Sequence, residues 1–254
     1  MKKVAIVCAA GRQGTCLVNE AVSRGYDVTG FVRGGDKVAN PKAKTVVKDL
    51  FELTSEDLSG FDVVIDAFGA WTPETLPLHR TSLAHLCDVL SGTKVRLLVV
   101  GGAGSLYVDP EHTVQVKDLE SFPDVFKPLA NMQGAALDDL RKRSDVLWTF
   151  LSPAGDFVAD GERTGEYLLG GEEYFVNEKG ESRISYADYA IAMIDEIENA
   201  NNIQKRFSVI GKKNSPKRVN GKKGASRGCG RRLSLFREAS CYALSLLPST
   251  STIL

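Results

Sequence analysis

A glycine-rich loop near the start of the chain connects an apolar run to a helical pattern. Residues 4–7 are apolar, the loop follows, and apolar side chains recur at helical spacing over residues 15–24. This order predicts a buried strand, a tight turn and a helix, whose first N–H groups and positive end favour a diphosphate. The sequence therefore predicts a dinucleotide site at this loop. Its residues are Gly11, Arg12, Gln13 and Gly14.

The two loop glycines have different expected tasks. Gly11 has no side chain to keep a phosphate away from the backbone, and Gly14 lets the helix pack close to the first strand. In the related glycine pattern G-x-x-G-x-x-G, the first position would fall on Cys8. Cys8 is therefore the one departure of this loop from the pattern.

Short apolar segments alternate with helical patterns along the next 130 residues. Strands rich in β-branched residues that alternate with helices predict a doubly wound parallel sheet, the α/β Rossmann fold, with its ligand at the carboxyl ends of the strands. We expect further strands at 27–33, 44–49, 61–67, 95–100 and 146–151. We expect helices at 15–24, from about 55, at 74–90 and at 124–143.

The pattern changes after residue 152. Residues 166–176 indicate a hairpin, Ser185 and Asp188 have the spacing of a helix start, and residues 206–210 resemble a last strand. We therefore expect one Rossmann domain over residues 1–210, with a small substrate-side hairpin and helix at its end. Residues 153–185 are the candidate substrate lid.

Charge divides the chain into two unlike parts, although its net charge is zero. Residues 211–254 hold ten Lys or Arg side chains against one acid, Glu238, which leaves 22 basic and 31 acidic side chains in residues 1–210. A Lys/Arg/Gly/Ser-rich segment of this kind is typical of a disordered tail. It could contact nucleic acid or another acidic surface, or it could be a frameshifted end. We favour the frameshifted end, so no nucleic-acid partner is expected.

Cysteine usage and hydropathy bear on the compartment. The five cysteines show no C-x-x-C spacing and are odd in number, so neither a zinc site nor a disulfide framework is expected. No apolar run approaches the roughly 18–20 residues of a membrane span. These features predict a cytoplasmic protein with reduced thiols and no membrane contact, either a monomer or a homodimer.

Two arginines favour one form of the cofactor. Arg33 ends the second expected strand, 19 residues after Gly14, where an NAD-specific site would carry a carboxylate for the adenosine ribose. A guanidinium can instead pair with a 2′-phosphate, and Arg12 in the loop could reach the same group. We therefore expect NADP(H) to be preferred, with NAD(H) possible. The alternative is that both arginines are simply solvated.

Strand ends supply further candidate cofactor contacts. Asp49 and Leu50 close the third strand and could bracket the adenine, although Asp49 could equally cap a turn. The small residues that close the fourth strand would let the cofactor ribose lie against the backbone. That set is Ala67, Phe68 and Gly69.

The fifth strand ends in Gly101 and Gly102, which are also cofactor candidates. The hydroxyl of Ser105 would follow near the nicotinamide, and the alternative for this residue is an ordinary turn serine.

The proton-donating pair of common short-chain reductases is incomplete. Such enzymes use Tyr-x-x-x-Lys, and here Lys127 stands at a plausible position while Pro123 occupies the tyrosine position. Proline cannot donate a proton, which argues against carbonyl reduction and sugar epimerisation. Reduction of a flavin or quinone needs less from the protein, so a flat small-molecule acceptor is expected. Ser105 and Lys127 are the candidate catalytic residues.

Histidine and aromatic side chains are weaker candidates for a functional role. His79, His85 and His112 show no metal spacing, and we interpret all three as surface or capping residues. Trp71, Tyr107 and Phe157 could stack on a flat ring, although each could equally belong to a core.

Four segments in order carry a family resemblance. Residues 99–106, 148–153, 161–165 and 180–190 are similar to the bacterial NAD(P)H-binding, NADH-flavin reductase family of atypical short-chain dehydrogenases, which is related to biliverdin reductase B and NmrA-like proteins. The resemblance covers about residues 1–210. It implies a Rossmann fold, dinucleotide binding through the loop and Arg33, and nicotinamide contacts near Ser105 and Pro153.

The resemblance implies two possible functions. One is hydride transfer from NADPH to a flavin, quinone or similar acceptor, with flavin as a substrate rather than a tightly bound group. The other is a non-catalytic NADP(H) sensor, because NmrA-like relatives bind the cofactor without turnover.

Overall fold

The computed structural model describes residues 1–212, and the predicted basic tail lies outside them apart from its first two residues. Eight strands form one sheet in the order β3-β2-β1-β4-β5-β6-β10-β8, in which every pair is parallel except β8 with β10. The order reverses between β1 and β4, so the chain is doubly wound. The bounds are β1 (Lys3–Val7), β2 (Asp27–Val32), β3 (Lys44–Val47), β4 (Val63–Asp66), β5 (Arg96–Val100), β6 (Leu147–Ser152), β8 (Tyr167–Gly170) and β10 (Lys205–Gly211).

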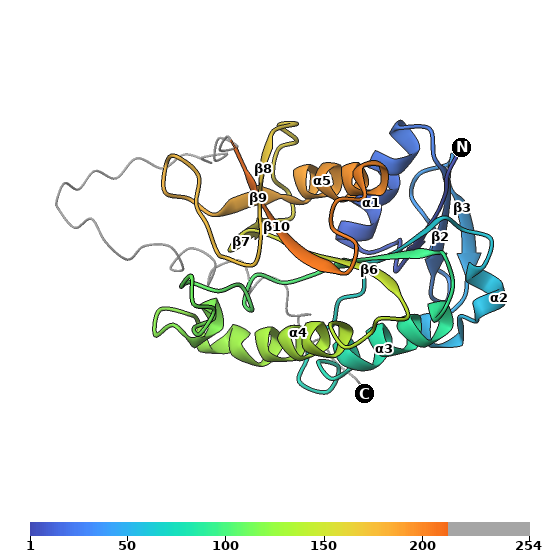
Figure 1. Cartoon of the computed structure of the whole chain (residues 1–254). Helices are drawn as coiled ribbons and strands as arrows, with labels where there is room; N and C mark the ends of the chain where they lie inside the picture. Colours follow the sequence, from blue (N-terminus) through green and yellow to red (C-terminus); the bar gives the residue numbers. More distant parts are fainter. Residues whose placement is uncertain (213–254) are drawn as a thin grey trace, which may run out of the picture.

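Helices cover both faces of this sheet (Figure 1). On one face, α1 packs beside α5, and on the other face α3 packs beside α4 and α2. Each layer buries its own apolar core against the alternate side chains of the central strands. The helix bounds are α1 (Arg12–Ser23), α2 (Ser55–Leu58), α3 (Leu78–Leu90), α4 (Lys127–Leu140) and α5 (Tyr186–Asn199).

The expected Rossmann architecture is confirmed, with shifted helix boundaries. The first helix begins at Arg12, three residues earlier than its apolar pattern, because Gly11 already occupies the N-cap position. The third begins at Leu78 rather than residue 74, since Pro77 precedes it and lacks the N–H of an interior helical residue. At α5 the prediction holds, because Ser185 Oγ accepts the N–H of Asp188 at 3.0 Å.

The hairpin predicted over residues 166–176 is wrong. β8 pairs antiparallel with β10, its partner lying 35 or more residues away in the sequence, while Tyr174 N–H donates to the Tyr107 carbonyl instead. The apolar residues of this segment instead form an edge strand of the main sheet. A separate two-stranded parallel sheet joins β7 (Asp156–Val158) to β9 (Arg183–Ser185).

A buried ion pair ties α5 to the sheet. Arg96 of β5 lies 2.9 Å from the Glu196 carboxylate and also donates to the Glu196 backbone carbonyl at 2.9 Å. The same carboxylate accepts both the backbone and side-chain N–H groups of Asn202. This network joins the C-terminal end of α5 to β5 and to the loop that leads into β10.

Within residues 1–212, no helix combines the length and apolar character needed to cross a membrane.

Candidate functional site

The glycine-rich loop lies at the carboxyl end of β1 and opens α1. Gly11 is the N-cap residue; within residues 1–212 no side chain caps the helix, and its first turn holds no acidic residue. The first N–H groups of a helix have no partner within it, so those of Arg12, Gln13 and Gly14 are available to an anion. This end of α1 is therefore suited to a diphosphate.

Close packing explains why Gly14 has no side chain. A Cβ added there would lie 2.4 Å from the Cys8 carbonyl oxygen and 2.9 Å from the Ala9 Cα, both of them backbone atoms. At Gly11 the added atom would lie 3.3 Å from the same oxygen. The loop folds back on itself tightly enough for Gly11 N–H to donate to the Cys8 carbonyl at 3.0 Å.

Cys8 adopts a backbone conformation that favours glycine. Its φ is +59°, in the left-handed region, which explains why a glycine would suit this position in the pattern. Burial, reinforced by the Asp66 charge, raises the pKa of the thiol to about 12. Cys8 is therefore a neutral, poorly nucleophilic side chain in the turn, not a reactive thiolate.

Arg12 and Arg33 stand out among the arginines of residues 1–212. Both are exposed, and they are the two whose guanidinium makes no ion pair within that part of the chain. Arg33 follows the carboxyl end of β2, and Arg12 begins α1. Two unpaired cations thus flank the glycine-rich loop, where a second anionic group of a dinucleotide can be neutralised.

Gln13 supplies an orphaned polar atom at the same place. Its side chain is 8% exposed, its Nε2 donates to the Tyr186 carbonyl at 3.3 Å, and its Oε1 has no partner among the described residues. Tyr186 begins α5 and packs on Phe157 of β7, with ring centroids 4.1 Å apart. The candidate lid therefore borders the N-terminal end of α1.

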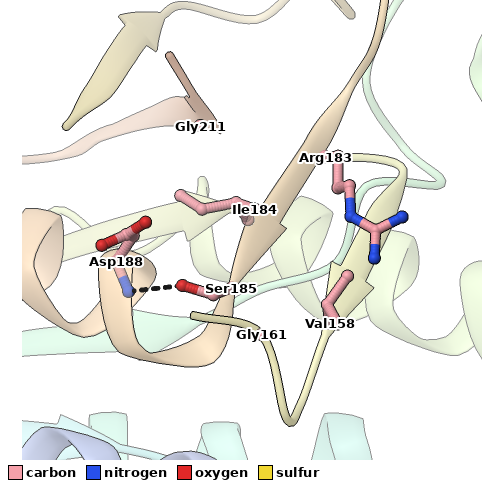
Figure 2. Close-up of a pocket in the computed structure, with 7 residues that line it drawn as sticks. All are labelled: Val158, Gly161, Arg183, Ile184, Ser185, Asp188 and Gly211. Carbon is pink, nitrogen blue, oxygen red and sulfur yellow. Dashed lines mark hydrogen bonds between the residues drawn. The ribbon is translucent and has the colours of Figure 1, made fainter. Parts of the chain in front are cut away.

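Contacts to α5 and to α1 anchor residues 163–165 of the candidate lid. Asp188 of α5 accepts the N–H groups of Thr164 and Gly165, each at 2.9 Å, and Arg163 lies 2.9 Å from Glu20 of α1. Figure 2 shows Asp188 beside Ser185, with which it forms the helix cap, in a small cavity that Val158 also lines. The role of residues 153–185 as a substrate lid stays a prediction.

The predicted cofactor contacts after β3 and β4 differ in burial and in their partners. Asp49 accepts the Phe51 N–H at 2.9 Å and so caps a turn of 3₁₀ helix, as the alternative interpretation had it. Leu50 is 4% exposed and belongs to the core of the α3 and α4 face. Ala67 and Phe68 follow β4 half-buried, and Gly69 is exposed beside the Trp71 indole.

Gly101 and Gly102 end β5 against bulky neighbours. A Cβ at Gly101 would lie 2.1 Å from the Phe150 ring, and one at Gly102 would lie 2.1 Å from the Gln133 amide oxygen. Pro153 follows β6 and is buried. These residues share the edge with the glycine-rich loop, and their cofactor contacts stay predictions.

The two candidate catalytic residues come from the loop after β5 and from the start of α4. Ser105 is 5% exposed, and its hydroxyl accepts from the Arg206 guanidinium at 3.0 Å. Lys127 begins α4 at the surface and pairs with Asp124 at 2.7 Å. Both side chains thus have structural partners, and their catalytic roles stay predictions.

His79 corrects the interpretation of the histidines. It is 9% exposed rather than at the surface, with Nε2 3.1 Å from the Ala70 carbonyl, and burial lowers its pKa. His85 and His112 are half-buried or exposed, as expected, and bond to Leu53 and Glu173. In residues 1–212, no three His, Cys, Asp or Glu side chains gather into a metal site.

Two stacking candidates are occupied by protein contacts. Tyr107 stacks on His112 at 4.5 Å, and Phe157 packs on Tyr186 and Tyr189. Trp71 is 62% exposed beside Gly69 and could contact a bound ring.

Three polar groups that sequence reasoning missed meet beside Gly101. Asp66 ends β4 at 4% exposure, Ser82 of α3 is 1% exposed, and Gln133 reaches across from α4. Burial raises the pKa of Asp66 from 3.8 to about 6, against a smaller lowering by the Phe68 N–H that it accepts. A carboxylate ending an apolar strand was the available signal, because it stands at the edge where ligands bind.

A family model for NAD(P)H-binding proteins matches residues 8–197, which is most of the described chain. The chain belongs to the NAD(P)H-binding family. The resemblance inferred from sequence is thereby confirmed, and three features of residues 1–212 fit a dinucleotide at this edge: the start of α1 without a side-chain cap, the orphaned Gln13 oxygen and the unpaired arginines.

Three relatives match this NAD(P)H-binding protein over nearly the whole of their own length. YwnB of Bacillus subtilis (strain 168), an uncharacterized protein, is 45% identical over 82% of this chain and 98% of its own. The crystal structure of SP1627 from Streptococcus pneumoniae TIGR4, "a putative NADH-flavin reductase", is 51% identical with a TM-score of 0.80, over 83% of this chain and 100% of that one. A "putative epimerase" from Bacteroides thetaiotaomicron is 36% identical with a TM-score of 0.72, over 83% and 97%.

Proposed function

We propose that this NAD(P)H-binding protein is a reductase that uses NADPH to reduce a flavin, a quinone or a similar flat acceptor. The observation that carries the cofactor half of the proposal is the pair of unpaired, exposed guanidinium groups of Arg12 and Arg33 beside the uncapped end of α1. A ribose-binding carboxylate would repel a 2′-phosphate, whereas these cations attract it.

The chain's own residues would hold the cofactor in three places. The N–H groups of Arg12, Gln13 and Gly14 would take the diphosphate, with Arg12 and Arg33 on the 2′-phosphate. Gly101 and Gly102, against which the Phe150 ring and the Gln133 amide pack, would lie beside the nicotinamide half, near Pro153. When bound, the reduced nicotinamide supplies a hydride.

The acceptor half of the proposal is supported by what the α4 region lacks. Pro123 stands where a proton-donating tyrosine would, and Lys127 is paired with Asp124 at the surface. A carbonyl substrate needs a positioned proton donor because its alkoxide product is a strong base, while a flat conjugated acceptor gives a weaker base and needs mainly orientation. The flavin reductase name of the Streptococcus relative agrees with this class, with flavin acting as a substrate.

A non-catalytic NADP(H) sensor is the second candidate. It is favoured by Ser105 and Lys127, whose functional groups are both engaged by protein partners. A sensor would bind NADPH through the same loop and signal through a protein partner.

Steady-state oxidation of NADPH separates the two functions. Purified protein is mixed with NADPH and, in turn, FMN, FAD and a naphthoquinone, and the nicotinamide absorbance is followed. Turnover with at least one acceptor, faster with NADPH than with NADH, supports the reductase. Tight NADPH binding with no acceptor consuming it supports the sensor and contradicts the reductase.

A further inference from the structure

A small polar cavity lies between the sheet and the helices α3 and α4. It has a volume of about 20 Å³, and β4, β5, α3 and α4 all contribute to its wall. A cavity needs roughly 10–15 Å³ and two to four polar partners to hold a water molecule. This cavity meets the size requirement for one water and is too small for a ring.

The polar lining of the cavity is incompletely bonded. The hydroxyl of Ser82 is fully buried with no partner among the described residues, and an unsatisfied buried hydroxyl costs free energy. Asp66 accepts one N–H, from Phe68 at 2.9 Å, through one of its two carboxylate oxygens. Gln133 contributes a side-chain amide at the half-buried rim, over Gly102. A water in the cavity would bridge these groups.

The cavity also reaches the edge at which the cofactor is expected. Gly101, which follows β5, and Phe68, which lies two residues after β4, line it together with Asp66. The glycine at position 101 admits no side chain, because a Cβ there would meet the Phe150 ring at 2.1 Å. The carboxyl group of Asp66 therefore shares one cavity with Gly101 and Phe68, at the edge where the nicotinamide is proposed to bind.

Among residues 1–212, the titratable groups that face Asp66 are uncharged near neutral pH. The titratable groups facing it are Cys8 in the glycine-rich loop, and His79 and Cys87 of α3. Burial raises the pKa of each thiol to about 12 and lowers the pKa of His79, so all three are neutral. Gln133, on the α4 side, is neutral as well. Burial, with no cation of residues 1–212 paired to its ionised form, raises the pKa of this carboxyl group to about 6.

We propose that Asp66 is the proton source for the reduced acceptor, passing its proton through one water molecule held in this cavity by Ser82 and Gln133. The inference rests on the proposed reductase function. The acceptor gains two electrons and one hydrogen as a hydride from the reduced nicotinamide, which leaves an anion on an oxygen or nitrogen of the acceptor. The water protonates that anion and is reprotonated by Asp66, whose carboxylate then recovers a proton from solvent past the half-buried rim at Phe68 and Gln133.

The decisive variant is Asp66→Asn, which keeps the acceptor oxygen for Phe68 N–H but cannot supply a proton. Asp62→Asn is the matched control, because Asp62 is exposed just before the other end of β4 and accepts the Lys3 N–H. We expect Asp66→Asn to lower kcat by about tenfold to a hundredfold, within the range of general acid catalysis, and to leave the NADPH dissociation constant within about twofold. The wild-type kcat should fall as pH rises through about 6, whereas the kcat of Asp66→Asn should not.

A second readout needs no turnover. In the cofactor-free protein, the infrared carbonyl band of a protonated carboxylic acid should titrate with a midpoint near pH 6 and be missing in Asp66→Asn. Ser82→Ala removes the unpartnered hydroxyl with little risk to folding, and it should shift this midpoint and lower kcat by a smaller factor, while Asp62→Asn changes neither.

Two outcomes overturn the inference, and they differ from failure of the proposed function. Wild-type turnover that Asp66→Asn matches at every pH removes Asp66 as proton source while leaving the reductase intact. The proton-source role is also removed if the infrared band of the protonated carboxylic acid is absent above pH 5, or if this band persists in Asp66→Asn. If the wild type oxidises NADPH with none of the acceptors, the proposed function itself fails and the proton-source role falls with it.

Discussion

At the scale of single residues, cofactor preference depends on two arginines. Arg33→Glu replaces a cation beside the 2′-phosphate position by an anion, so NADPH affinity should fall by roughly 30-fold or more, the effect of losing a charge-assisted hydrogen bond. NADH, which has no 2′-phosphate, should bind about as well as before. Fluorescence titration of both cofactors measures the two affinities.

The control for this change is Lys94→Glu. Lys94 is exposed just before β5, at the opposite edge of the sheet, and the substitution changes net charge by the same amount. It should alter neither affinity. Equal losses of NADPH and NADH affinity in Arg33→Glu would contradict the assignment of the 2′-phosphate site.

The burial of the Asp66 carboxyl group also leads to a prediction about stability. Its pKa is raised from 3.8 to about 6 on folding, so the folded state holds the proton over a pH range where the unfolded state has lost it. Stability therefore falls as pH rises from about 4 to 6, and the ionised carboxylate costs on the order of 2–3 kcal/mol above that range. Asp66→Asn should raise the free energy of unfolding at pH 7.5 by a similar amount.

Urea unfolding at several pH values checks this sign. The gain of Asp66→Asn over the wild type should shrink toward zero near pH 3.5, where both proteins are neutral at position 66. A variant less stable than the wild type at pH 7.5, or a gain that grows as pH falls, would show that the buried carboxyl is stabilised by partners and not strained by burial.

Residues that act through the backbone were predictable from sequence, and residues that act through distant neighbours were not. Gly11 and Gly14 could be placed because their task depends on local spacing. Ser82, Gln133 and Asp66 come from three elements, and their meeting in one cavity depends on how α3 and α4 pack on the sheet. His79 was misplaced at the surface for the same reason.

At the scale of elements, the packing of α1 on β1 sets the shape of the loop. Gly14→Ala would place a methyl group 2.4 Å from a backbone oxygen, which the helix can relieve only by moving away from the strand. We expect a loss of about 1–3 kcal/mol in the free energy of unfolding, together with weaker NADPH binding.

Gly60→Ala is the matched comparison for this substitution. A Cβ at Gly60 has nothing within 4 Å, and this residue does not have a positive φ. Its free energy of unfolding should stay within about 0.5 kcal/mol of the wild type. If Gly14→Ala is as stable as Gly60→Ala and binds NADPH normally, the close approach of α1 to the loop is not required.

The strands of the doubly wound sheet were predictable as far as β6, but the pairing of β8 was not. The strands up to β6 alternate with helices, so connection rules fix their neighbours. β8 lies beyond that regular part, and its short apolar sequence suits a hairpin and an antiparallel edge strand equally well. Its pairing with β10 is determined by sequence more than 30 residues away, which periodicity within residues 166–176 does not contain.

At the scale of the whole molecule, the buried pair Arg96–Glu196 joins the sheet to the last helix. Glu196→Ala would leave the Arg96 guanidinium buried without its carboxylate and would release Asn202. Removing one partner of a buried pair costs about 3–5 kcal/mol, and urea unfolding should show a loss of that size.

Asp138→Ala provides the comparison for the buried pair. Asp138 pairs with Arg141 at the surface with 61% of its side chain exposed, and exposed pairs contribute about 0–1 kcal/mol. Equal losses in the two variants would mean that the Arg96–Glu196 pair does not anchor α5.

The central claim is that this NAD(P)H-binding protein transfers hydride from NADPH to a flat acceptor. The most direct test is a single-turnover mixing experiment, in which protein holding a stoichiometric amount of NADPH is mixed with FMN, FAD or a naphthoquinone. The account predicts that nicotinamide absorbance and acceptor absorbance fall together, at one rate and in equal amounts. NADPH that stays bound and reduced with every acceptor would contradict it.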